Sequence, residues 1–406
     1  MDKYNTISSN SVFGQLISLL PKDSIIELIQ QHGSDRYTKR FKTMDHLLTM
    51  LFASFTRSSV LREIEASMAG FARKLERLGV NHLPKRSTLS DANNKRDASV
   101  FEAIYHQCYS HLRHLLPDSY PKNEKWMEKL FIVDSTTITL FKEILKACGN
   151  AAANGRKKGG VKIHIGMHLS ESVPSMACIT SAATSDTKFM PRFKNMPADT
   201  ILVFDKAYVN YGLYNHWSNT QVKFVTRLHG HSKVEVQEEL SVDREQQKNG
   251  VYRAQIVQLG HSQQKDKVKC RLIYFYDKDK NRVLKFLTND FSMSLSRIAE
   301  IYKQRWQIEM LFKRLKQNLQ LSDFVGDNEN AIRIQIWTNL IADLLLTIIK
   351  KGVKRKMAYS NIAALVRIHL LSFVKLNDLL LKPGDKRIYN NNSYGTQLSL
   401  YSNTSP

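Results

Sequence analysis

The chain has 406 residues, of which 42% are hydrophobic and 24% are charged. This composition is that of a folded protein long enough to form two or three domains. It carries 60 Lys and Arg residues against 37 Asp and Glu residues, a formal net charge of +23. Because phosphate contacts release counterions, this excess favours a nucleic-acid partner, with a ribosome or an anionic membrane surface as the alternatives.

Cysteine usage and hydropathy indicate the compartment. The four cysteines lie far apart and form no C-x-x-C pair, which argues against a zinc site and against a secreted disulfide framework. The first residues, MDKYNTISSN, lack the layout of a signal peptide. The apolar stretch from Trp337 contains Asp343 and is too short to span a bilayer. We therefore expect a soluble, cytoplasmic protein with no membrane partner.

Residues 1–118 are predicted to be a helical N-terminal region. Apolar residues recur at helical spacing in HLLTMLFASF and in SSVLREIEASMAGFARKLERLGV. A basic loop containing Arg86 then leads into another amphipathic helix. Short helices with basic loops suit DNA binding, although a plain helical bundle that shields the next domain fits the pattern almost as well.

Strand patterns begin near residue 126. Residues 130–134 (LFIVD) and 201–205 (ILVFD) are continuous apolar runs, as in strands that are buried on both faces of a sheet. Between them, residues 161–169 alternate apolar and polar side chains, and residues 175–183 form a further strand. The pattern predicts an antiparallel ribbon followed by a return strand, which together make a mixed sheet.

The second half of the chain contains a strand-rich block, one strong helix and a helical end. Residues 221–290 alternate strand patterns with polar turns, and residues 294–321 form the helix. We predict a central domain over residues 119–327 that contains this block. Residues 328–406 form a helical C-terminal region with a polar tail and a possible dimerisation surface.

Two acids follow buried strands. Asp134 ends the run LFIV, and Asp205 ends the run ILVF. A carboxylate at the end of a buried strand is costly unless something outside the sheet uses its charge. Mg²⁺ prefers oxygen ligands, and ligands gather beyond strand ends in open α/β sheets. The pair therefore predicts a shared hard cation, with turn or helix-cap roles as the alternative for each Asp alone.

A third acid, Glu309, lies in the pattern Y-x-x-R-x-x-x-E-x-x-x-x-x-x-K, formed with Tyr302, Arg305 and Lys316. At about 100° per residue, these four side chains fall within an arc of about 60° on one helix. Beside them runs an apolar stripe that can pack on a sheet. The helix thus presents an acid, two bases and a phenol on one edge; a solvated face with an Arg305–Glu309 ion pair is the alternative.

Together, Asp134 in IVDSTT, Asp205 in VFDKAY and the helix signature around Glu309 resemble the IS-four family of bacterial insertion-sequence DDE transposases. The resemblance covers roughly residues 40 to 350. It implies an α/β, RNase H-like mixed sheet flanked by helices, with a strand-rich insertion between the second Asp and the Glu. One departure is Lys206 and Ala207, where the family often has Arg and Gly.

The resemblance also implies the chemistry. The three acids would hold two Mg²⁺ ions, for which Mn²⁺ can substitute, and would hydrolyse DNA at the ends of the element. The freed 3′-hydroxyl would then attack target DNA, with a hairpin intermediate on the way. Arg305 and Lys316 would hold phosphates, and Tyr302 would donate a hydrogen bond to a phosphate oxygen. Double-stranded DNA, as terminal inverted repeats and target, is the expected partner of a homodimer.

Further residues are candidate DNA contacts. Trp306 offers a stacking surface for an unpaired base, although a core tryptophan fits equally well. His164 lies on the polar side of its strand beside Lys162, and we expect it to approach the metal site or a phosphate, with an ordinary surface histidine as the alternative. Lys157 and Lys158 lie in the basic loop GRKKGGVK, which predicts contact with the DNA backbone, or else a solvated hairpin.

Two other functions fit parts of these patterns. A metal-dependent nuclease on the same fold would hydrolyse DNA without joining strands. A non-catalytic DNA-binding protein derived from such an element would keep the basic charge, but three acids that face a polyanion serve no purpose in a pure binder.

Overall fold

The computed structural model describes residues 11–116, 124–139, 160–230, 232–260, 267–321, 323–353 and 355–385. The chain divides into two compact units, which are described separately below. The helical unit comprises residues 1–115 and 337–406, and the sheet unit comprises residues 116–336. The N-terminal and C-terminal helical regions therefore belong to one unit.

The helical unit is built around the buried helix α3 (Thr43–Thr56), whose side chains are almost all inaccessible. Two of its buried polar side chains form hydrogen bonds: Ser54 Oγ donates to Asn339 Oδ1 at 2.7 Å, and His46 Nε2 lies 2.8 Å from Asn93 Oδ1. These hydrogen bonds offset part of the cost of placing polar groups in a core. The other helices that lie wholly in this unit are α1 (Val12–Ile17), α2 (Lys22–Gln31), α4 (Leu61–Gly70), α5 (Ala72–Glu76), α6 (Arg86–Lys95), α7 (Ala98–Leu112), α13 (Tyr359–Ile368) and α14 (Leu376–Leu381).

Helix α12 (Glu329–Gly352) is long and apolar enough to cross a membrane by length and composition. The sequence-based expectation of too short an apolar stretch was wrong, because the helix begins at Glu329 rather than near Trp337. Of its most apolar window, 89% is buried inside the protein. Burial of this extent is what the core helix of a folded domain shows.

One nine-stranded sheet forms the centre of the sheet unit, in the order β3-β2-β1-β4-β5-β9-β8-β7-β6. Strands β1, β2 and β3 are antiparallel to one another, whereas β4 is parallel to β1 and β5 is parallel to β4. This arrangement of β3 to β5 is RNase H-like, and it confirms the predicted mixed α/β fold. The strands of this half are β1 (Leu130–Thr139), β2 (Gly160–His168), β3 (Met176–Ser181), β4 (Ile201–Phe204) and β5 (Lys223–Arg227).

The predicted strand-rich block extends the same sheet. Strand β5 pairs with β9, and β8, β7 and β6 follow in antiparallel order. The first strand of the block thus completes the parallel part of the sheet, and the other strands continue from its edge. These are β6 (Val234–Leu240), β7 (Val251–Leu259), β8 (Val268–Asp277) and β9 (Arg282–Thr288), with α9 (Arg244–Lys248) between β6 and β7.

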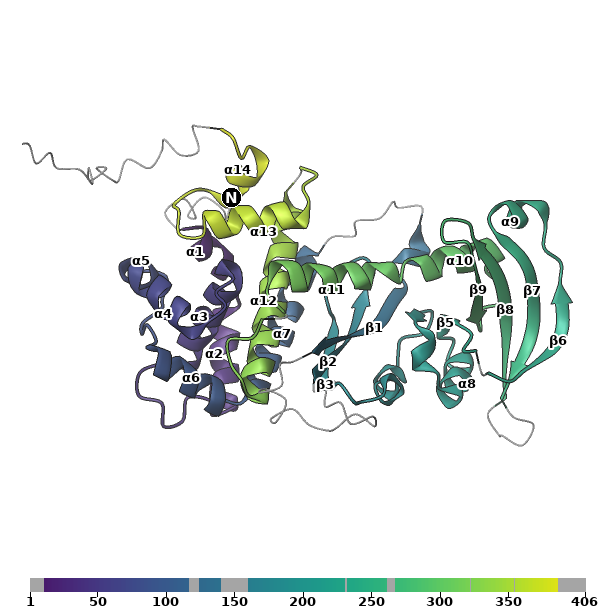
Figure 1. The fold of residues 1–406 in the computed structure, drawn as a ribbon, viewed down its shortest axis with the longest axis horizontal. Helices are drawn as coiled ribbons and strands as arrows, with labels where there is room; N and C mark the ends of the chain where they lie inside the picture. Colours follow the sequence, from purple (N-terminus) through teal and green to yellow (C-terminus); the bar gives the residue numbers. More distant parts are fainter. Residues whose placement is uncertain are drawn as a thin grey trace, which may run out of the picture. The chain divides into compact units, whose positions relative to one another are not determined.

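Helices cover both faces of this sheet, as Figure 1 shows for α8 (Tyr211–Asn219) on one side and for α10 (Leu295–Lys303) and α11 (Trp306–Asn318) on the other. On the α8 side, Trp217 packs with Phe204 and Phe224 in a fully buried aromatic cluster. On the opposite side, the ring of Tyr302 on α10 lies 4.9 Å from that of Phe286 on β9. Because side chains alternate along a strand, the residue that follows Val133 or Phe204 faces α10 and α11.

The helix predicted over residues 294–321 is two helices, α10 and α11, joined at Gln304 and Arg305. Both residues keep helical dihedral angles, but their N–H groups donate to Ile301 and Tyr302, three residues earlier, at 3.1 Å. This is 3₁₀ geometry, which tightens a helical turn. The prediction of one continuous helix was therefore wrong at this turn, although the two helices follow each other directly (Figure 1).

Candidate active site

The two strand acids lie side by side in the sheet. Val133 on β1 and Phe204 on β4 are the last register pair of the parallel strands, and Asp134 and Asp205 each come next. Strand β1 does not end at Asp134, as the sequence suggested, but continues to Thr139 against β2. Asp205 does follow the end of its strand. The two acids therefore face α10 and α11 at the level where β4 ends and β1 continues.

Asp134 is held by two donors. The Ser135 N–H donates to its Oδ1 at 2.8 Å, and Arg305 Nη1 donates to its Oδ2 at 2.5 Å. Burial raises the pKa of Asp134 to about 6, and the nearby carboxylates of Asp205 and Glu309 add to the rise, whereas Arg305 and the Ser135 N–H oppose it. The side chain thus sits where a negative charge requires a cation close by.

Glu309 lies in the first turn of α11, where a negative charge is favoured by the helix dipole. Its Oε1 accepts a hydrogen bond from Arg305 Nη2, so the Arg305 guanidinium bridges Glu309 and Asp134. The ion pair between Arg305 and Glu309 is the alternative that the sequence left open, and the structure contains it. It does not exclude the site, because the same arginine also holds the strand acid.

Asp205 has different partners. Arg227 Nη2 and the Tyr302 hydroxyl donate to its Oδ1 at 3.0 and 3.2 Å. Burial alone would raise the pKa of Asp205, but the Lys206 N–H and Arg227 outweigh it, so the pKa lies below its usual range. Arg227 was not predicted from the sequence; it is the last residue of strand β5, just as the two aspartates come directly after apolar runs. A charged residue after a third buried run was the available signal.

The three acids line one open cavity of about 600 Å³. Its walls also include Lys313, Lys316 and Arg305. Within the residues that the structure describes, no three His, Cys, Asp or Glu side chains form a ready metal site. The donor set nevertheless fits a hard divalent cation, because it consists of carboxylate oxygens whose mutual repulsion Arg305 now offsets.

The remaining signature residues lie near this cavity. Lys316 lines it and donates to Thr136 Oγ1 at 2.8 Å. Tyr302 is buried, and its hydroxyl contacts Asp205. Trp306 is 53% exposed, which excludes the core-tryptophan alternative, and the Lys280 ammonium lies 5.8 Å from its ring centroid.

His164 and Lys162 do not join the acids. His164 pairs with Ser135 across β1 and β2, so its side chain lies on the opposite face of the sheet from Asp134. It is fully buried and stacks on Phe189, and burial lowers its pKa to about 4. The expected approach of His164 to the metal site or a phosphate was therefore wrong. Lys162 points to the same side and pairs with Asp186 at 3.2 Å.

Three further candidates, Arg86, Lys157 and Lys158, belong to no described part of the sheet unit. Arg86 is the first residue of α6 in the helical unit, where its side chain is exposed. Lys157 and Lys158 lie outside the described residues.

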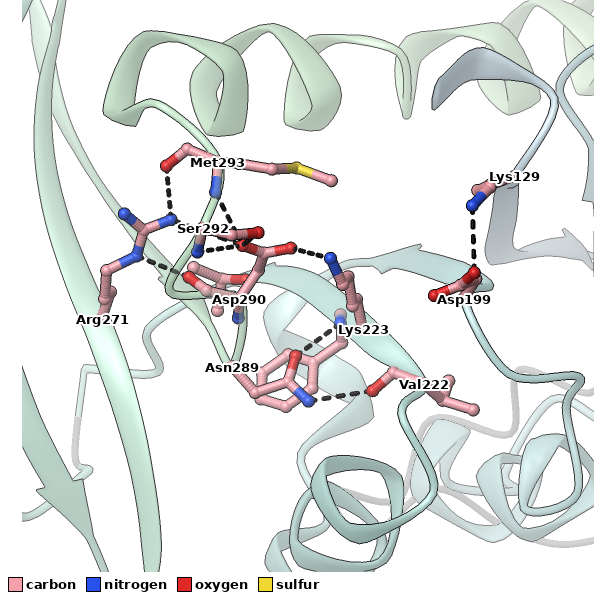
Figure 2. A network of polar contacts seen from close by, with 11 residues as sticks. Lys129, Asp199, Val222, Lys223, Arg271, Asn289, Asp290, Ser292 and Met293 are labelled. Carbon is pink, nitrogen blue, oxygen red and sulfur yellow. Dashed lines mark hydrogen bonds and ion pairs between the residues drawn. The ribbon is translucent and has the colours of Figure 1, made fainter. Parts of the chain in front are cut away.

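A buried ionic network fixes the start of α10, the helix that leads to Arg305 and Glu309 (Figure 2). Asp290 Oδ1 accepts from the N–H groups of Ser292 and Met293 at 2.7 and 2.8 Å, and its Oδ2 pairs with Lys223 Nζ at 2.6 Å. Arg271 donates to the carbonyl oxygens of Asp290 and Met293. The network thereby ties the turn before α10 to strands β5 and β8.

An RNase H-like sheet that brings three acids into one basic cavity is typical of metal-dependent enzymes that cut nucleic acids. The family described as "Transposase DDE domain" matches residues 125–345, more than half of the chain. A domain of unknown function matches residues 8–81. The chain belongs to the DDE transposases, which are metal-dependent enzymes that cut DNA and transfer its strands, and this confirms the resemblance to insertion-sequence transposases.

Individual relatives agree with this assignment. The chain is 30% identical over 65% of its length to a protein of Sinorhizobium fredii that is named as a transposase, y4zB, of which the match covers 71%. It is 28% identical over 78% of its length to a Synechocystis protein named as a transposase of insertion sequence element IS4SA, of which 87% is covered.

Among solved structures, a piggyBac transposase in a synaptic complex with hairpin DNA aligns with 97% of this chain, and the alignment covers 86% of the piggyBac transposase chain. The identity is 12% and the TM-score is 0.44. A likeness of this size leaves the fold and the chemistry to be argued from the chain itself.

Proposed function

We propose that this transposase binds the two ends of an insertion sequence, cuts them and joins the freed 3′-hydroxyl ends to target DNA. The proposal rests on one observation above all: Asp134, Asp205 and Glu309 line one cavity that is open to solvent and rimmed by lysines. The name of the Synechocystis relative, which assigns it to an insertion sequence element, supports the choice of substrate.

In this proposal, Asp134, Asp205 and Glu309 hold two Mg²⁺ ions, for which Mn²⁺ can substitute. Such a metal pair activates water at a phosphodiester and stabilises the leaving oxygen. The protein supplies the rigid placement: β1 and β4 fix the two aspartates in neighbouring register, and the network around Asp290 anchors the helices that carry the glutamate. Tyr302 and Arg227 orient Asp205 by donating to one of its oxygens.

The basic residues then position DNA. Lys316 lines the cavity and can give up its hydrogen bond to Thr136 to bind a phosphate oxygen instead. Arg305, which lies between two acids, can likewise give up its hydrogen bond to Asp134 for a phosphate oxygen. Trp306 offers an exposed ring beside Lys280 for a base that has left the duplex. Arg86 on α6, with Lys157 and Lys158, would contact the DNA backbone, and residues 1–118 would form the region that recognises the ends.

Several finer points belong to the same proposal. A hairpin intermediate follows from the resemblance of the sequence to its family. Two ends must meet in one complex, so a homodimer on the DNA is expected, with residues 328–406 as the pairing region. A protein that acts on bacterial DNA works in the cytoplasm, at the nucleoid.

The experiment that tests the proposal incubates the full chain with Mg²⁺ and DNA that carries the inverted repeats flanking its coding region. Nicking at the repeat ends followed by joined products is the expected result. Cleavage without any joined product would favour the alternative, a nuclease on the same fold.

A further inference from the structure

Arg305 lies between two of the three acids. Its Nη1 donates to Asp134 Oδ2 at 2.5 Å, and its Nη2 donates to Glu309 Oε1. The two carboxylates come from different elements, strand β1 and helix α11, so this one guanidinium joins them. A planar guanidinium with its fork of donors suits such bridging.

The bridge uses oxygens that a divalent cation would need. The Arg305 guanidinium lies at hydrogen-bond distance from Asp134. Because the Arg305 side chain is only 18% exposed, water screens this ion pair weakly. A divalent ion at the same oxygens would meet the guanidinium charge a few ångströms away. The two cations therefore compete for Asp134 and Glu309.

Asp205 differs in this respect. Arg227 and Tyr302 both donate to Oδ1, and no described residue bonds its Oδ2 through a side chain. Asp205 thus keeps an oxygen for a metal while it remains held by the protein. Competition is confined to the Asp134–Glu309 side of the cavity.

We propose that Arg305 is a placeholder cation, which occupies the Asp134–Glu309 side of the site until a DNA phosphate draws it away and a divalent ion replaces it. The inference rests on the proposed function for the assignment of the acids as metal ligands. By linkage, DNA that withdraws Arg305 tightens metal binding, and metal tightens DNA binding to the same extent.

The test is a titration of the full chain with Mn²⁺, followed by calorimetry, in the absence of DNA. Arg305→Met should bind Mn²⁺ at least about fivefold more tightly than the wild type, the lower end of ordinary coupling between sites. Arg305→Lys, which keeps a charge but cannot bridge with a fork, should fall between the two. A circular-dichroism spectrum checks that each variant is folded.

Lys313→Met is the matched control. Lys313 lies on the same helix and lines the same cavity, and it forms no hydrogen bond or ion pair with the part of the chain that the structure describes. Its removal changes the net charge equally and should shift Mn²⁺ affinity by less than about twofold, as for a screened surface charge. Equal tightening in both variants, or unchanged or weaker binding in Arg305→Met, would overturn the placeholder role.

A second arm adds a short DNA duplex that carries a nick. The wild type should then bind Mn²⁺ more tightly, whereas Arg305→Met should gain little. Asp134→Asn distinguishes a failure of the proposed metal site from a failure of the placeholder role of Arg305. If wild type and Asp134→Asn bind Mn²⁺ alike, the proposed metal site itself fails; if Asp134→Asn loses binding while Arg305→Met matches the wild type, only the placeholder fails.

Discussion

Val133 and Phe204 form the last register pair of parallel strands β1 and β4, and the residue after each is an acid. Asp134 and Asp205 thereby reach the same face of the sheet, beside one another, without any loop to place them. On that face α11 brings Glu309 to the same cavity. The site is built on regular elements, which hold catalytic groups more rigidly than loops do.

Removing any one of these acids should abolish cleavage. We expect Asp134→Ala, Asp205→Ala and Glu309→Ala each to lower the cleavage rate by more than about a hundredfold, which is the upper effect of losing a group that only supports a metal ligand. Binding to end DNA, measured by mobility shift, should persist. Glu300→Ala is the control, because this exposed acid on α10 pairs with Arg297 and does not line the cavity. Wild-type cleavage in any acid variant would remove that acid from the site.

Sequence patterns predicted the acids because their signals are local. An apolar run followed by Asp marks a buried strand that meets a charge, and the spacing around Glu309 marks one edge of a helix. The face on which His164 lies depends instead on the register of β2 against β1. A change of this register by one residue moves every side chain of the strand to the other face of the sheet. Its burial therefore could not be predicted from the alternation alone.

Partner choice was equally hard to predict. The contacts of Arg305 with Asp134 and of Arg227 with Asp205 join residues that are 171 and 22 positions apart in the chain. They depend on which strands are neighbours, and hence on topology. The sequence has no Pro or Gly near the 3₁₀ turn at Gln304 and Arg305, so its apolar pattern predicted an unbroken helix.

Asp290→Asn should loosen the sheet unit. Loss of one partner from a buried ionic network costs about 3 kcal/mol or more, because the cations that remain lose their counter-charge. Hydrogen exchange of β8, β9 and α10 should show the loss. The control is Asp199→Asn: Asp199 pairs with Lys129 at 3.1 Å, also in Figure 2, but both side chains are exposed. That change should cost less than about 1 kcal/mol, and equal effects would contradict the role assigned to Asp290.

The effect of Asp290 should depend on pH. Burial alone would raise the pKa of Asp290, but Lys223 and the N–H groups of Met293 and Ser292 outweigh it and hold the pKa below its usual range. A carboxyl with a lowered pKa stabilises the folded state above its unfolded pKa, about 3.9, and loses this contribution as the pH falls through the folded value. The difference in unfolding free energy between wild type and Asp290→Asn should be constant from about pH 5 to 7, because this range lies about one unit or more above both pKa values. The difference should shrink below about pH 4. A difference that grows on acidification would be the wrong sign.

Trp306 should matter for an unpaired base and not for folding. Its ring is half exposed, so Trp306→Ala should leave the unfolding temperature nearly unchanged. Binding to DNA with an unpaired base should weaken by about 1–3 kcal/mol, the range for base–aromatic stacking. Trp306→Phe keeps a ring and should retain much of the affinity. Equal binding by Trp306→Ala and the wild type would remove the stacking role.

Lys316→Met should lower the salt dependence of DNA binding. Each phosphate contact adds about 0.9 to the slope of log K against log salt, and Lys316 lines the cavity that would receive the scissile phosphate. We expect the slope to fall by about that amount, with similar losses for all DNA sequences. Fluorescence anisotropy over a salt series measures it, and an unchanged slope would place Lys316 away from phosphate.

The central claim is that this chain cuts and joins DNA at one three-acid site. Its most direct test is a strand-transfer reaction with the full chain, Mg²⁺ and a labelled end already cut to expose its 3′-hydroxyl, with plasmid as the target. We predict labelled end covalently joined to plasmid by the wild type and none by Glu309→Ala. Joined product from Glu309→Ala at the wild-type level, or none from a wild-type protein that binds and cuts the same ends, would contradict the account.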